Sequence, residues 1–275
     1  MLINCRGILV DVSEPKVMGI LNVTPNSFYD GGKFHQQDAA LRQAEKMLSD
    51  GADFIDIGAC STKPNAEFVS EADEIARLKP VLEAIAKEFP KALISVDTFR
   101  AAVAEMAVKE GAAMVNDVSA GNLDANMLPT VAKLQVPYIM MHSRGDAATM
   151  QNLTQYDDLI KEILFYFSQK VAFARSLGIH DLIIDPGFGF AKTLSQNYHL
   201  LKNLSLFQMI ELPVLVGISR KSMIYKHLDI SANEALNGTT VLNTLALSQG
   251  ANILRVHDVK EAVETIQLYS IFKNS

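Results

Sequence analysis

The stretch Asp50-Gly51-Ala52-Asp53-Phe54 joins the end of one helical pattern to the start of one buried strand. The same polar-Gly-Ala-x-apolar form recurs at residues 110–113 and 249–253. Glycine often follows the last helical residue, because it adopts the left-handed conformation of a C-cap without steric cost. Three further glycines stand where a helix is expected to end: Gly111, Gly178 and Gly250. The repeated junction therefore predicts helices that alternate with buried strands.

Working outward from this junction, we find short apolar runs that indicate eight buried strands, over residues 17–21, 54–57, 93–96, 113–115, 138–141, 182–184, 214–216 and 253–256. Helical patterns lie near residues 38–49, 71–88, 100–109, 124–134, 156–177, 194–204, 234–249 and 258–272. Eight such pairs predict a closed (β/α)₈ TIM barrel. Residues 2–12 precede it and indicate an N-terminal β-hairpin around Arg6-Gly7.

An open, doubly wound sheet is the alternative architecture. A G-x-G-x-x-G loop after the first strand would favour it, and the sequence has none. The sequence also has no linker or low-complexity stretch that would divide it. We therefore expect residues 1–275 to form a single TIM-barrel domain.

Composition limits the classes of function. The 275 residues carry a net charge of −6, which argues against general nucleic-acid binding. The two cysteines are too few for a disulfide framework, and no apolar run approaches the ~20 residues of a membrane helix. We expect a cytoplasmic protein with small-molecule substrates and neither nucleic acid nor membrane as a partner.

Polar residues stand where most of the predicted strands end. In a TIM barrel the carboxyl ends of the strands carry the active site. Some of these residues could serve only as helix N-caps, but carboxylates, amides and cations at nearly every strand end are harder to explain in that way. The residues at these positions are Asn22, Asp56, Asp97, Asn116, Asp117, Met141, His142, Asp185, Ser219, Lys221, Arg255 and His257.

Two sites follow from these positions. Asp97, Asn116, Asp185 and Lys221 could bind the edge of a flat heterocycle, because carboxylates accept N–H donors and an amide both donates and accepts. The second is Arg255-Val256-His257, where strand alternation turns both basic side chains to one side just before a helix begins. This arrangement favours an anion site, although an ion pair of Arg255 inside the barrel remains possible.

The loop after the sixth strand reads Asp185-Pro186-Gly187-Phe188-Gly189-Phe190-Ala191-Lys192. Asp-Pro-Gly alone is ordinary turn chemistry. Two aromatic residues after a strand-end carboxylate, however, could form a support for a flat ligand. We expect Phe190 rather than Phe188 to face that ligand, and Lys192 to be a solvated loop residue.

Six motifs, in this order, resemble those of the dihydropteroate synthases: Met18–Phe28, Ser95–Thr98, Val115–Ser119, Asp185–Phe190, Gly217–Ser222 and Arg255–Val259. The resemblance covers nearly the whole chain. It implies a TIM-barrel transferase of folate biosynthesis, usually a homodimer, that uses Mg²⁺ and is a sulfonamide target. Such an enzyme condenses (7,8-dihydropterin-6-yl)methyl diphosphate with 4-aminobenzoate to give 7,8-dihydropteroate and diphosphate.

The resemblance also implies roles for individual residues. The pterin would be bound by Asp97, Asn116, Met141, Asp185, Phe190 and Lys221. The diphosphate would be bound by Asn22, Thr62, Arg255 and His257, with Asn22 as the metal ligand. The 4-aminobenzoate would contact Phe28, Thr62, Lys63, Pro64, Phe190, Lys221 and Ser222. Asp97, Lys221, Arg255 and His257 would be catalytic, in a mechanism where diphosphate leaves before the aniline nitrogen attacks a pterin methylene cation.

The second loop departs from the family pattern, since Lys63 and Asn65 stand where Arg and Gly are usual. Lysine lacks the planar fork of arginine, so a bidentate contact there is lost. Two other functions remain as alternatives. A methyltransferase that binds methyltetrahydrofolate would have no use for the anion site at Arg255 and His257, and a non-catalytic barrel would not need to keep Asp97 or Lys221.

Overall fold

The computed structural model describes residues 1–23, 33–60, 69–146 and 148–275, and within them eight parallel strands form one sheet. Their order is β8-β7-β6-β5-β4-β3-β10-β9. The strands are β3 (Lys16–Asn22), β4 (Phe54–Gly58), β5 (Leu93–Asp97), β6 (Met114–Asp117), β7 (Tyr138–Met141), β8 (Leu182–Asp185), β9 (Leu215–Val216) and β10 (Ile253–Val256).

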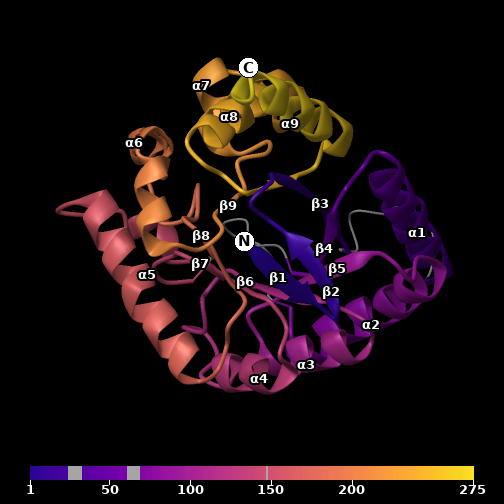
Figure 1. Cartoon of the computed structure of the whole chain (residues 1–275). Helices are drawn as coiled ribbons and strands as arrows, with labels where there is room; N and C mark the ends of the chain where they lie inside the picture. Colours follow the sequence, from indigo (N-terminus) through magenta and orange to yellow (C-terminus); the bar gives the residue numbers. More distant parts are fainter. Residues whose placement is uncertain (24–32, 61–68, 147) are drawn as a thin grey trace.

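The ends of this sheet meet at one parallel bridge between Ile184 and Val214. The Ile184 N–H donates to the carbonyl of Pro213 at 3.0 Å across the same seam. The sheet thereby closes into the barrel that the eight apolar runs predict. Figure 1 shows the helices as an outer ring around the strands.

The helices of the described ranges are α1 (Lys33–Ser49), α2 (Glu71–Glu88), α3 (Ala101–Lys109), α4 (Met127–Leu134), α5 (Leu159–Ser176), α6 (Leu194–Lys202), α7 (Ser222–Leu228), α8 (Leu236–Ser248) and α9 (Val259–Lys273). Short 3₁₀ segments lie at Met150–Asn152, Leu204–Ile210 and Ala232–Glu234. Helix α7 was not expected from the sequence. Four helix-terminating glycines have positive φ, as their positions predict: Gly51, Gly111, Gly178 and Gly250. No helix in the described part of the chain is long and apolar enough to cross a membrane.

The predicted hairpin is present as β1 (Leu2–Cys5) and β2 (Ile8–Asp11), which pair antiparallel. It lies over the middle of the ring of helices in Figure 1. Its buried side chains Ile3 and Cys5, together with Val12, belong to one apolar cluster with the first inward layer of the barrel. The barrel members of that cluster are Met18, Phe54, Ala113, Met114, Ile139, Ile183, Leu215 and Ile253. The hairpin therefore covers the amino-terminal end of the barrel.

Two residues beyond this apolar layer along each strand, the side chains that point into the barrel become polar or charged on most strands. Because alternate side chains of a strand share one face, the residues after this apolar layer also point inward. On five strands they are polar or charged: Asp56, Ser95, Asn116, Asp185 and Arg255. Burying such groups is costly unless they are paired. The fold thus concentrates its interior polar chemistry at the carboxyl end, opposite the hairpin.

Candidate active site

Arg255 of β10 is held between two carboxylates. Its Nε donates to Oδ2 of Asp56 at 2.6 Å, and its Nη2 donates to Oδ2 of Asp97 at 2.7 Å. Burial opposes the guanidinium charge, but the two carboxylates outweigh it and raise the pKa of Arg255. A guanidinium has five N–H donors. These two bonds use two of them within the described residues, which leaves donors for an anion.

The ion pair inside the barrel, left open by the sequence, is therefore present. Asp56 is fully buried and also accepts a hydrogen bond from Nδ2 of Asn116 at 3.0 Å. Its other oxygen, Oδ1, has no hydrogen-bond partner among the residues that the structure describes, and the same is true of the buried Ser95 Oγ. Asp56 and Ser95 are paired in the β4–β5 register. Buried polar atoms without partners mark a place for water or ligand.

Asp97 lies at the end of β5, where its neighbour in the register is Gly58. A Cβ at position 58 would lie 3.1 Å from the Cβ of Asp97, so glycine gives this carboxylate its room. Burial raises the pKa of Asp97, the Arg255 charge lowers it, and the Asp56 charge raises it again. The site thus holds two carboxylates on one guanidinium, and the second of them resists ionisation.

Asp185 ends β8 and is only 6% exposed. Its Oδ1 accepts the backbone N–H of Gly187 at 2.8 Å, which folds the start of the loop around the carboxylate. Burial raises its pKa, while the charge of Lys221 is the strongest influence in the other direction. Asp185 is therefore both a turn former, as its Asp-Pro-Gly context indicates, and a buried hydrogen-bond acceptor.

Lys221 reaches the same loop from beyond β9. Its Nζ donates to the carbonyl of Phe188 at 2.5 Å and lies 4.7 Å from the centre of the Phe190 ring. Burial lowers the pKa of Lys221 to about 8, against the opposing charge of Asp185. Phe188 is fully buried whereas Phe190 is partly exposed, so Phe190 is the ring that a ligand can contact.

Lys192 corrects one expectation from the sequence, because it is not a solvated loop residue. It is 5% exposed, and its Nζ lies 2.8 Å from the carbonyl oxygen of Gly187, 3.0 Å from that of Phe190 and 3.1 Å from Nδ1 of His142. These three acceptors match the three hydrogens of an ammonium group. Burial lowers the pKa of Lys192 to about 7 and that of His142 to about 2.

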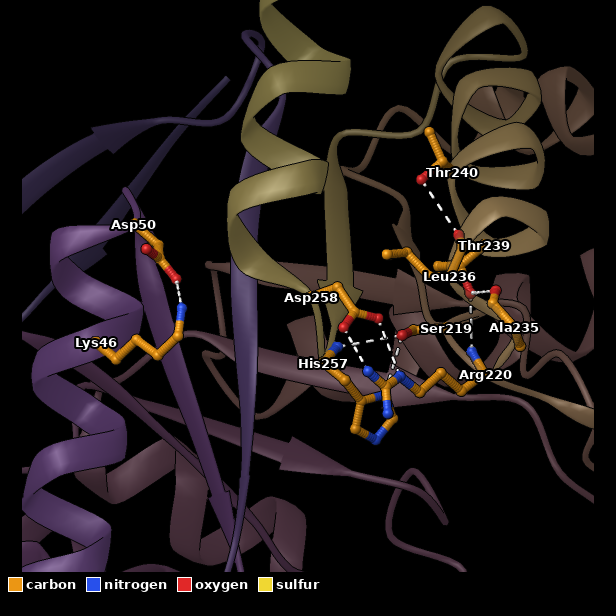
Figure 2. A network of polar contacts seen from close by, with 10 residues as sticks. All are labelled: Lys46, Asp50, Ser219, Arg220, Ala235, Leu236, Thr239, Thr240, His257 and Asp258. Atoms are coloured by element: carbon orange, nitrogen blue, oxygen red, sulfur yellow. Dashed lines mark hydrogen bonds and ion pairs between the residues drawn. The ribbon is translucent and has the colours of Figure 1, made fainter. Parts of the chain in front are cut away.

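The anion end of the site is built by two successive pairs between the loops after β9 and β10 (Figure 2). The Ser219 Oγ lies 3.0 Å from Nδ1 of His257. The next residues, Arg220 and Asp258, form a bidentate ion pair, with Nε to Oδ2 at 3.0 Å and Nη2 to Oδ1 at 2.5 Å. The position of His257 agrees with the expectation from the sequence, whereas its partner Ser219 does not follow from the sequence.

The remaining predicted residues divide into two groups. Met141 is buried at the end of β7, Asn22 is exposed at the end of β3, and Ser222 begins α7. Phe28, Thr62, Lys63 and Pro64 lie outside the described residues, so their predicted contacts are not located. Three side chains of the network had no role assigned from the sequence: Asp56 and Ser219, which were noted only for their places at strand ends, and Lys192.

The residues suit a flat, polar-edged ligand with an anionic group. Acceptors and donors surround the barrel end at Asp97, Asn116, Asp185 and Lys221, and basic side chains stand beside them at Arg255 and His257. The described part of the chain contains no group of three or more His, Cys, Asp or Glu that could hold a metal ion.

Comparison with known proteins gives a consistent result. The family model described as pterin binding enzyme matches residues 18–257. The chain is 43% identical to the dihydropteroate synthase of Escherichia coli K12 over 265 residues, which is 96% of this chain and 93% of that protein. It is 47% identical to the dihydropteroate synthase of Synechocystis over 247 residues, covering 89% and 85% of the two chains.

Solved structures agree with these relatives. The Yersinia pestis dihydropteroate synthase in complex with a sulfonamide drug superimposes with a TM-score of 0.94 at 42% identity, and the match covers 100% of both chains. The Xanthomonas albilineans dihydropteroate synthase with 4-aminobenzoic acid superimposes with a TM-score of 0.93 at 35% identity, covering 100% of this chain and 98% of that one.

Proposed function

The chain belongs to the dihydropteroate synthases, a family of pterin-binding enzymes, and from this membership we propose a role for each side chain at the strand ends. It is a transferase of folate biosynthesis that joins a dihydropterin methyl diphosphate to 4-aminobenzoate, with release of diphosphate. The observation that carries the proposed roles is the meeting of Asp56, Asp97, Asn116 and Arg255 at one end of the barrel, on four different strands.

The pterin binds against β5 to β8 and the Asp185–Lys192 loop. Asp185, Asn116 and Asp97 bind its polar edge, because a carboxylate accepts the N–H donors of an aminopyrimidinone and an amide complements both donors and acceptors. Lys221 donates to an acceptor of the ring, a role supported by its nearness to Phe188, Phe190 and Asp185. Met141 and Phe190 pack against the faces of the ring.

The diphosphate binds to the cationic side of the site. Arg255 keeps N–H donors beyond those given to Asp56 and Asp97 within the described residues, and His257 adds a ring N–H. Asn22 and Thr62 complete this part. As the C–O bond breaks, these donors stabilise the charge that develops on the leaving oxygens, which is the kind of interaction that accelerates a reaction most.

The carboxylates act on the other product of bond breaking. Loss of diphosphate leaves a cationic methylene group conjugated with the pterin, and the ionised form of Asp97, which is held against Arg255, stabilises it. The neutral aniline nitrogen of 4-aminobenzoate then attacks this carbon, with the second substrate held by Phe28, Thr62, Lys63, Pro64, Phe190, Lys221 and Ser222. No covalent enzyme intermediate is needed, so no nucleophilic side chain is required, and the proton that the aniline nitrogen loses after its attack passes to the released diphosphate.

Mg²⁺ fits this site only as an ion held mainly by substrate. Proteins often bind Mg²⁺ through one or two side-chain oxygens together with waters and phosphate oxygens. The side chain of Asn22 offers one such oxygen, exposed at the end of β3. The bound ion would offset negative charge on the diphosphate.

A homodimer is also proposed, together with a cytoplasmic location and a single domain over residues 1–275. Helices α8 and α9 pack side by side and expose large apolar side chains, and exposed apolar surface often marks a protein interface. The exposed residues are Val241, Leu245, Leu268, Ile271 and Phe272. The molar mass measured by light scattering would test the dimer.

The activity is tested by measuring diphosphate and dihydropteroate formation with each substrate and Mg²⁺ supplied or withheld. We expect dihydropteroate only when both substrates and Mg²⁺ are present. Absence of product under the complete conditions, with a folded protein by circular dichroism, would falsify the synthase assignment. A methyl transfer from methyltetrahydrofolate in place of this reaction would favour the alternative family of pterin-binding methyltransferases.

A further inference from the structure

Ser219 makes two contacts to one residue. It follows β9, is 4% exposed, and its Oγ lies 3.0 Å from the ring nitrogen Nδ1 of His257 and 3.1 Å from the backbone nitrogen of the same residue. Figure 2 shows both contacts between the two loops. The two nitrogens of His257 differ in their hydrogen-bonding roles, because the backbone N–H can only donate whereas the ring nitrogen Nδ1 can donate or accept.

The hydrogens can be assigned from these contacts. The backbone N–H of His257 donates, so the Ser219 oxygen accepts at that contact. The hydroxyl still has one hydrogen to donate, and Nδ1 of His257 is the acceptor that the described residues place within reach. Nδ1 then carries no proton. In a neutral imidazole the proton must consequently be on Nε2, which makes that nitrogen a donor.

The position of Ser219 is itself fixed by the next residue. Arg220 has a left-handed backbone with φ of 54°, and its N–H donates to Thr239 Oγ1 at 3.1 Å. Thr239 in turn donates to the carbonyl of Ala235 at 2.8 Å. The Arg220 side chain holds Asp258 bidentately, immediately after His257. Both ends of the Ser219–His257 contact are therefore anchored to rigid elements.

We propose that Ser219 is a positioning residue that fixes His257 as the tautomer with its proton on Nε2. This inference rests on the proposed function of His257 in binding diphosphate. The opposite tautomer would turn a lone pair of Nε2 toward the anionic oxygens and repel them. A histidine whose second nitrogen is fixed by a neighbour gains both a defined tautomer and a defined ring orientation.

The experiment compares Ser219→Ala with the wild-type protein, using ¹⁵N-labelled histidine and nuclear magnetic resonance. The His257 signals are identified by their loss in His257→Gln. In the neutral ring of the wild type, we expect Nε2 to be the protonated nitrogen. In Ser219→Ala we expect a mixture of tautomers. Ser248→Ala is the matched control, because Ser248 is an exposed residue of α8 whose hydroxyl bonds only to the carbonyl of Leu245 among the described residues.

Steady-state kinetics give the second measurement. We expect Ser219→Ala to lower kcat/KM for the pterin diphosphate by about 10–100-fold, the range seen when a histidine loses an outer hydrogen-bond partner. The KM for 4-aminobenzoate should stay close to that of Ser248→Ala, while the thermal midpoint should fall modestly, because the backbone N–H of His257 loses its acceptor. Ser219→Cys, whose thiol is a weak donor, provides an intermediate case and replaces the alanine variant if that protein folds poorly.

The outcomes separate this inference from the proposed function. A single Nε2–H tautomer in both Ser219→Ala and Ser219→Cys would overturn it, whatever the activity. A tautomer mixture with reduced kcat/KM for the pterin diphosphate would support it. Because the resonance measurement needs no substrate, a wild-type protein that lacked synthase activity would contradict the proposed function without changing the tautomer result.

Discussion

The Nε of Arg255 lies 2.6 Å from Oδ2 of Asp56, and this contact joins β10 to β4 across the barrel interior. Asp56 is fully buried, and the side chain of Arg255 is 19% exposed. Removing Arg255 would leave two carboxylates without their cation, whereas removing Asp56 would leave Arg255 paired with Asp97 alone. The pair is therefore a structural requirement of the site as well as part of its electrostatics.

Asp56→Ala should lower the free energy of unfolding by about 1–3 kcal/mol, because Arg255 keeps its ion pair with Asp97 while the buried Asn116 amide loses its acceptor. Chemical denaturation measures this change. Asp50→Ala is the control, since its partner Lys46 is on the surface, and its unfolding curve should nearly overlay that of the wild type. Equal losses of unfolding free energy in the two variants would show that the interior pair stabilises the protein no more than the surface pair does.

Asp185→Asn should weaken pterin binding by about 1–3 kcal/mol, because a buried acceptor is replaced by a group that must also donate. Isothermal titration calorimetry with a pterin ligand measures the affinity. Asp181→Asn serves as the control at the other end of β8, where Asp181 accepts the Asn4 backbone N–H at 3.1 Å. Unchanged pterin affinity in Asp185→Asn would reduce Asp185 to a turn former.

The activity should decline in alkaline solution because of Lys221. Burial lowers its pKa to about 8, so the ammonium form is present below that pH and is lost above it. If the ammonium donates to the pterin, kcat/KM falls as the pH rises through about 8. Arginine stays protonated throughout this range.

Lys221→Arg should therefore remove this alkaline decline, even if its kcat/KM is lower at every pH, and Lys202→Arg should retain it. The pH dependence of kcat/KM for the three proteins checks the assignment. A decline that persists unchanged in Lys221→Arg would assign it to another group or to the substrate.

Gly187→Ala should destabilise the protein far more than Gly178→Ala. Both glycines have positive φ, 73° and 85°, so backbone strain is similar. A Cβ at position 187 would lie 2.0 Å from the carbonyl oxygen of His142, whereas a Cβ at 178 would meet nothing within 4 Å. Thermal unfolding of the two variants separates the steric contact with the His142 carbonyl from the cost of the backbone conformation. Equal unfolding midpoints would contradict the prediction.

Much of the fold could be predicted because its signals are local. Each apolar run and each helix-ending glycine acts within a few residues, and the strands agree with prediction to within one or two positions. Helix α7 was missed because its seven residues follow the Ser219-Arg220-Lys221 loop without a glycine boundary. The barrel closes through a single parallel bridge between Ile184 and Val214, and no local sequence pattern specifies that contact.

The site residues could be predicted where the alternation of side chains along a strand alone determines whether a side chain points into the barrel. Asp97, Asn116 and Asp185 follow from their positions in β5, β6 and β8. Lys192 was placed wrongly because its partners depend on how the loop turns back through Gly187 and Gly189, both with positive φ. Asp56 and Ser219 stood at strand ends, but their partners, Arg255 and His257, are far away in sequence. Such contacts become visible only when the barrel closes.

The hairpin that covers the amino-terminal end of the barrel also sets an order of events during synthesis. Ile3 and Cys5 are made before the barrel, yet two of the side chains that share their apolar cluster, Leu215 and Ile253, belong to its last two strands. A nascent chain on the ribosome must therefore carry an incompletely covered apolar hairpin until β10 has emerged. A segment that is translated before the barrel therefore completes its contacts only after the last barrel strand has been made.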